Sequence, residues 1–120
     1  MKKNIKDTGL HLTEESRGYL ERKIVHLEKY VRDGESSSID VEVAYDSGLP
    51  EKKFRTGIHL VADGKNMHAH ARGDTLHEAI DRATQELSIE ASRAKGKRLH
   101  AFRKGALRIK DFFRGTRNSI

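Results

Sequence analysis

Residues 54–72 have the sequence FRTGIHLVADGKNMHAHAR, and their pattern sets the arrangement of a whole sheet. Apolar and polar residues alternate on both sides of Asp63-Gly64, as in two half-buried strands. Asp-Gly between such strands is typical of a two-residue type I′ turn. The turn pairs Ala62 with Lys65, so the sequence predicts a β-hairpin of defined register.

The sequence before this hairpin predicts a strand, a helix and a further strand. Residues 39–45 alternate strictly, which indicates a strand with one wet face. Thr13 is typical of a helix N-cap. The helix after it has an apolar stripe formed by Leu20, Ile24, Leu27 and Val31. We expect Gly34 and the serines at 36–38 to end this helix, and residues 2–8 to form a strand at the sheet edge.

Residues 74–99, DTLHEAIDRATQELSIEASRAKGKRL, predict a second amphipathic helix that is acidic first and basic at its end. Thr75 and Glu78 form a capping-box pattern. The apolar face consists of Leu76, Ile80, Ala83, Leu87 and Ala91. The predicted order is therefore β-α-β-β-β-α, an α+β fold in which two helices pack on one face of a four-stranded mixed sheet.

The length of 120 residues fits one domain, and the charged residues are distributed unevenly along the chain. Residues 93–120 hold ten Lys or Arg and one Asp, whereas the preceding residues hold 14 basic and 17 acidic side chains. We predict a folded domain over residues 1–99 and a basic C-terminal tail over residues 100–120. The tail sequence is as compatible with a basic amphipathic helix as with a disordered segment.

Several classes of protein are disfavoured. There is no Cys, which excludes disulfides, thiolate nucleophiles and Cys-type zinc sites. The sequence has no signal-like start and no long apolar run, so we expect a soluble, cytoplasmic protein without a membrane partner. It also has no nucleophile-elbow, zincin or phosphate-loop motif, and we predict neither an enzyme nor a cofactor.

The basic residues indicate a polyanionic partner, RNA in particular. The candidate phosphate contacts lie on both predicted helices and comprise Arg22, Lys23, Lys29, Arg82, Arg93, Lys95, Lys97 and Arg98. An alternative is a protein-binding regulator, such as a modulator of transcription, that acts through the basic tail.

The hairpin register places His59 beside His68, with His70 next along the same wet face. Three interpretations of these histidines are open, namely a metal site, an RNA-contacting patch, and polar side chains that simply cover the solvated face of a sheet. We favour the last, because histidines on a flat sheet rarely close a tetrahedral shell without a further ligand.

Four short motifs, in this order and spacing, resemble the ribosome hibernation factors. They are Leu12-Thr13-Glu14, Leu27-Glu28-Lys29-Tyr30, Asp63-Gly64-Lys65 and Ala79-Ile80-Asp81. This is the family of ribosome-associated inhibitor A and hibernation promoting factor, also known as sigma-54 modulation proteins. The resemblance covers about residues 3–99.

The resemblance implies a fold similar to double-stranded-RNA-binding domains. It implies a protein that binds small-subunit rRNA in the channel for tRNA and mRNA and inhibits translation in starved or stationary bacterial cells. Other hibernation factors are further candidate partners. The family's second helix ends in spaced Lys and Arg residues, and this spacing is matched by Arg93, Lys95 and Lys97. The family's first helix is also basic, and its basic positions correspond to Arg17, Lys23 and Lys29.

Two features depart from the family pattern. Ile89 stands where the pattern predicts an Arg. The sequence stops at Ile120, so we expect no separate dimerisation domain and no direct pairing of ribosomes by this chain alone. The oligomeric state stays open.

Overall fold

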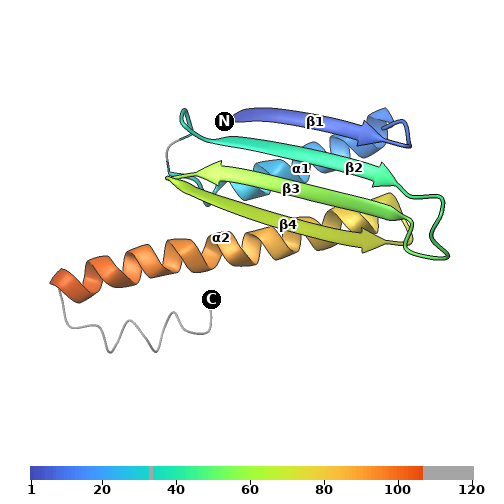
Figure 1. The fold of residues 1–120 in the computed structure, drawn as a ribbon. Coiled ribbons are helices and arrows are strands. Elements are labelled where there is room, and N and C mark those ends of the chain that lie inside the picture. The colour runs from blue at the N-terminus through green and yellow to red at the C-terminus, as the bar shows by residue number, and fades with distance from the viewer. Residues whose placement is uncertain (33, 107–120) are drawn as a thin grey trace.

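The computed structural model describes residues 1–32 and 34–106, with side chains as far as Arg93. Its elements are β1 (Lys2–Thr8), α1 (Glu14–Glu28), β2 (Ser38–Tyr45), β3 (Phe54–Ala62), β4 (Lys65–Gly73) and α2 (Leu76–Ala106). Both helices lie on one side of the sheet (Figure 1). The predicted α+β fold is confirmed.

The four strands form one mixed sheet in the order β1-β2-β3-β4, with β1 parallel to β2 and the other neighbours antiparallel. Asp63 and Gly64 have φ values of 54° and 78°, as a type I′ turn requires. Ala62 pairs with Lys65, so the register predicted from the Asp-Gly turn is confirmed.

Helix α1 begins as predicted but ends earlier. The backbone N–H of Ser16 donates to Thr13 Oγ1 over 3.1 Å, which confirms the N-cap. The helix ends at Glu28, not near residue 34, so the predicted C-terminal limit was wrong. The N–H groups of the next residues donate to carbonyls three residues back and so tighten the last turn. Val31 still packs against the core from this turn, which is why the apolar spacing looked like a longer helix.

Helix α2 is capped at Thr75 and is long. The N–H of Glu78 donates to Thr75 Oγ1 over 3.1 Å, and the Glu78 carboxylate accepts from the N–H of Asp74 over 2.7 Å. The helix has 31 residues, which corresponds to about 46 Å. It therefore projects past the end of the sheet (Figure 1). Its backbone continues through the predicted domain boundary at residue 99, and residues 107–120 lie outside the described part.

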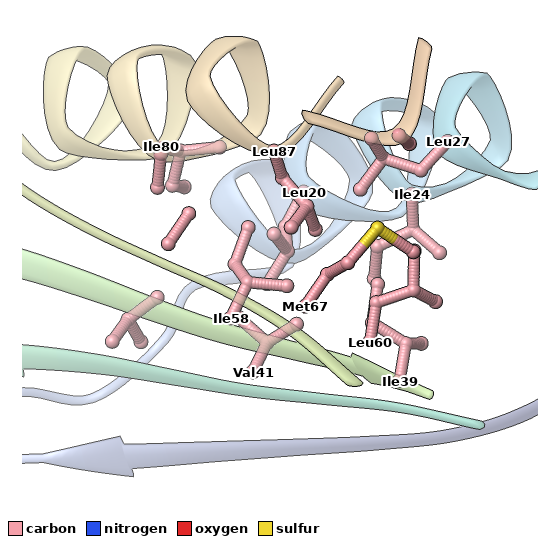
Figure 2. Packing of buried hydrophobic residues seen from close by; sticks show 14 of the residues in the cluster. Leu20, Ile24, Leu27, Ile39, Val41, Ile58, Leu60, Met67, Ile80 and Leu87 are labelled. Atoms are coloured by element: carbon pink, nitrogen blue, oxygen red, sulfur yellow. The ribbon is translucent and has the colours of Figure 1, made fainter. Parts of the chain in front are cut away.

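The core lies between the sheet and the two helices (Figure 2). Its largest fully buried apolar side chains are Leu20, Ile24, Leu27, Ile39, Val43, Ile58, Leu60, Ile80 and Leu87. Burial of one such side chain contributes roughly 1.5–3 kcal/mol to folding. Thr56 is a polar exception within this core, and its Oγ1 has no hydrogen-bond partner among the described residues.

Candidate nucleic-acid interface

The two helices run in the same general direction behind the sheet, and their C-terminal ends lie toward the same end of the domain (Figure 1). The basic ends of both helices are thereby brought to one end of the molecule. The partial negative charge at a helix C-terminus also favours cations there. We call the outer side of α1 and α2 the helix layer, and it is the candidate surface for a polyanion.

A groove of about 490 Å³ separates the two helices on this side. Its lining comes from both helices. Lys23 and His26 from α1 and Asp81, Gln85 and Ser88 from α2 contribute polar groups, and Leu27 contributes an apolar part. The polar groups offer hydrogen-bond donors and acceptors to a sugar-phosphate backbone.

Tyr19 joins the two helices at the N-terminal end of this groove. Its hydroxyl donates to Asp81 Oδ1, and its ring stacks on His77 with centroids 4.1 Å apart. His77 Nε2 lies 3.2 Å from the hydroxyl of Ser16. The hydrogen bond to Asp81, together with burial, raises the pKa of Tyr19. Burial raises the pKa of Asp81, but hydrogen bonds from Tyr19 and Lys23 outweigh it, so that pKa lies below its usual value.

Two of the predicted phosphate contacts already have acidic partners. Lys23 Nζ lies 3.2 Å from Asp81 Oδ1. Arg82 Nη2 lies 3.0 Å from Glu78 Oε2, one helical turn away on α2. A carboxylate so close offsets the field that each cation presents to a phosphate. Lys23 and Arg82 are therefore the weaker members of the predicted set.

Three other predicted contacts are exposed and have no carboxylate partner among the described side chains. Arg22 lies over the Tyr19 ring at 5.9 Å, and Lys29 over the Tyr30 ring at 5.3 Å. Arg93 is exposed on the flank of α2 that faces the β4 edge, in a hollow that is also lined by Glu86, Ile89 and Glu90. No carboxylate in the described part of the chain forms an ion pair with them, so we expect these three cations to be the strongest candidates of the set, although Arg93 shares its hollow with Glu86 and Glu90.

The remaining predicted contacts, Lys95, Lys97 and Arg98, lie on the backbone of α2, and their side chains lie outside the described ones. Their roles stay predictions. Ile89, which replaces the expected Arg, is 44% exposed. The basic flank of α2 is interrupted there, and among described side chains it resumes at Arg93.

The sequence interpretation missed the Tyr19–His77–Asp81 junction. A signal was present, because Tyr19 and Lys23 are four residues apart on α1, and His77 and Asp81 are four apart on α2. Residues at this spacing share a helix face, so each pair forms a matched ridge. Nothing in a single sequence, however, says which ridges of two helices meet.

The predicted histidine face is formed on the side of the sheet away from the helices. His59 and His68 stack with centroids 4.2 Å apart and planes within 8°, and His70 lies across Gly57. No group of three His, Asp or Glu side chains in the described part of the chain could hold a metal ion. Nor is any helix of that part long and apolar enough to cross a membrane.

Comparison with known proteins supplies a family. Residues 4–99 match the family described as Sigma 54 modulation protein / S30EA ribosomal protein. The crystal structure of the Thermus thermophilus Protein Y N-terminal domain is similar, with 26% identity and a TM-score of 0.65 over 78% of this chain and 98% of that one. A ribosomal subunit interface protein from Coxiella burnetii has the same fold, with 18% identity and a TM-score of 0.59 over the same shares. No curated protein matched the chain.

Proposed function

Because the chain belongs to the Sigma 54 modulation protein / S30EA ribosomal protein family, we propose that it is a ribosome-associated inhibitor of translation, a hibernation factor. It binds small-subunit rRNA in the channel for tRNA and mRNA and so keeps both out during starvation or stationary phase. The observation that carries this proposal is a set of exposed cations that form no ion pair with a described carboxylate, namely Arg22 and Lys29 on α1 and Arg93 on the flank of α2.

The contacts are electrostatic and need no base-specific reading. Each Lys or Arg that neutralises a phosphate releases counterions, so affinity falls steeply as salt rises. Phosphate contacts position a protein, and the shape of folded RNA then supplies selectivity. The hydrogen bond from Tyr19 on α1 to Asp81 on α2 supports this role, since it joins the two helices that carry the basic residues.

The role requires no catalysis and no cofactor, because occupation of the channel is itself the inhibitory act. It also places the protein in the cytoplasm, where the ribosome is its partner. Lys95, Lys97 and Arg98 are proposed to add further phosphate contacts from the same helix.

A sucrose-gradient profile of ribosomes, with and without the purified protein, tests the proposal. We expect the protein to co-sediment with the small subunit and with 70S particles, and to inhibit translation in a reconstituted system. Pull-downs with and without RNase separate the alternative. Partners that survive RNase, with no rRNA recovered, would favour a protein-binding regulator instead.

A further inference from the structure

The outer face of the sheet, away from the helices, carries rows of register neighbours contributed by all four strands. One row contains Asn4, Asp40, His59 and His68. The adjacent row contains Lys6, Glu42, Gly57 and His70. Because residues two apart on a strand share a face, these eight positions form one continuous surface.

Gly57 lets the His70 ring lie close over β3. A Cβ at this position would come within 2.9 Å of His70 Nδ1, so a side chain there would displace the His70 ring. Gly57 and His70 line a hollow of about 290 Å³ to which both rows contribute. It is wide enough for one nucleobase and too open to exclude water.

One wall of the hollow is a flat imidazole surface. His68 on β4 covers one face of the His59 ring by stacking, and the opposite face is directed toward β2, on the side of the hollow. His59 Nε2 lies 3.0 Å from Asn66 Oδ1, a contact that fixes the ring orientation. The free face of His59 is thus a preformed stacking platform.

Asp40 is the register neighbour of His59 and lines the same hollow. It is exposed, and among the described residues it makes no ion pair and no side-chain hydrogen bond. Glu42 differs, because it accepts a 2.7 Å hydrogen bond from Thr8 and lies 3.5 Å from Arg55. The Thr8 hydrogen bond and the charge of Arg55 lower the pKa of Glu42 despite its partial burial. Asp40 therefore remains the available acceptor beside the platform.

We propose that this hollow binds an unpaired guanine base, stacked on His59 and hydrogen-bonded to the Asp40 carboxylate. Guanine presents two adjacent donors, N1–H and N2–H₂, that match the two oxygens of a carboxylate. Uracil presents a single N–H between two carbonyl oxygens, and these oxygens are repelled by a carboxylate. Adenine has only one donor group, its amino group, on its Watson–Crick edge. Lys6 on the rim can neutralise the adjoining phosphate.

Stacking of unpaired bases on ring side chains, combined with hydrogen bonds to base edges, is a general mode of single-stranded RNA recognition. The site lies on the opposite side of the sheet from the helix layer, so it does not depend on the proposed function. Ribosome co-sedimentation tests the proposed function, and binding of short oligonucleotides tests the guanine site.

The experiment measures fluorescence anisotropy of uridine hexamers with the full chain. A hexamer with one central guanosine should bind about tenfold more tightly than hexauridine, the effect of one stacked and paired base. Inosine at that position lacks N2–H₂ and should lose most of the preference. Free guanosine monophosphate distinguishes the source of the base, since equal affinity indicates a mononucleotide ligand and weaker affinity indicates an RNA strand.

The variants distinguish loss of base recognition from loss of folding. Asp40→Asn and His59→Ala should each abolish the guanosine preference, whereas His59→Phe, which keeps a flat ring, should retain it. Glu51→Gln, a change at an exposed carboxyl in the β2–β3 loop and outside the hollow, serves as the matched control for Asp40→Asn and should leave the preference unchanged. Equal affinity for the two hexamers, or a guanosine preference that survives both Asp40→Asn and His59→Ala at unchanged melting temperature, would overturn the proposal.

Discussion

Lys23 of α1 and Asp81 of α2 form an ion pair with Nζ and Oδ1 3.2 Å apart, and the Tyr19 hydroxyl donates to the same carboxylate oxygen. One carboxylate on α2 thus receives two contacts from α1. This arrangement joins the helices above the core, and we expect it to lower the capacity of Lys23 to bind a phosphate. We therefore expect structural and binding roles to divide among the basic residues of α1.

The Asp81 carboxylate makes stability depend on acid pH. Its pKa is lowered in the folded state, so its stabilising contribution is present above the unfolded-state pKa of about 4 and is lost as pH falls through the folded value. Asp81→Asn should be less stable than the native chain at neutral pH, with the difference shrinking toward pH 2. Thermal melts across this range measure it. Glu51→Gln, a change at an exposed carboxyl, serves as control, and a difference independent of pH would contradict the assignment.

Thr56→Val should stabilise the domain. Thr56 is fully buried, and its Oγ1 has no hydrogen-bond partner among the described residues. Replacement of a buried hydroxyl without a partner by a methyl group of similar shape removes a desolvation cost of about 1–3 kcal/mol. Chemical denaturation should show a higher midpoint at unchanged slope. Thr56→Ser, which keeps the hydroxyl and loses the methyl, should be less stable than the native chain. A lower midpoint for the Val variant would mean that the hydroxyl is satisfied in solution.

Loss of the α2 cap should weaken the domain. Thr75 Oγ1 accepts from the N–H of Glu78, and removal of an N-cap oxygen costs about 1 kcal/mol. Thr75→Ala should therefore lower the unfolding midpoint in urea, whereas Thr75→Ser should stay close to the native value. If both variants lose the same stability, the packing of the Thr75 methyl group matters and the cap does not.

The hairpin was predictable to single-residue register, because Asp63-Gly64 carries its own backbone requirement and alternation fixes which residues face the core. The C-terminal end of α1 was not predictable, because Val31 continues the apolar helical spacing although it lies in a turn that packs on the same core. The candidate cations could be listed from the sequence, but their arrangement and their acidic partners could not, and their role in binding stays a prediction. Partners such as Asp81 and Glu78, which weaken Lys23 and Arg82, depend on side-chain geometry that spacing alone does not define.

Ribosome co-sedimentation across a salt series tests the central claim most directly. Alanine replacement of Arg22, Lys29 and Arg93 together should weaken binding and reduce the salt dependence by roughly three phosphate contacts, with little change in melting temperature. A control triple variant at Lys2, Lys52 and Lys53 loses the same charge away from the helix layer and should bind nearly as the native chain does. Equal loss of binding in the two triple variants, or none in the first, would contradict an rRNA contact through the helix layer.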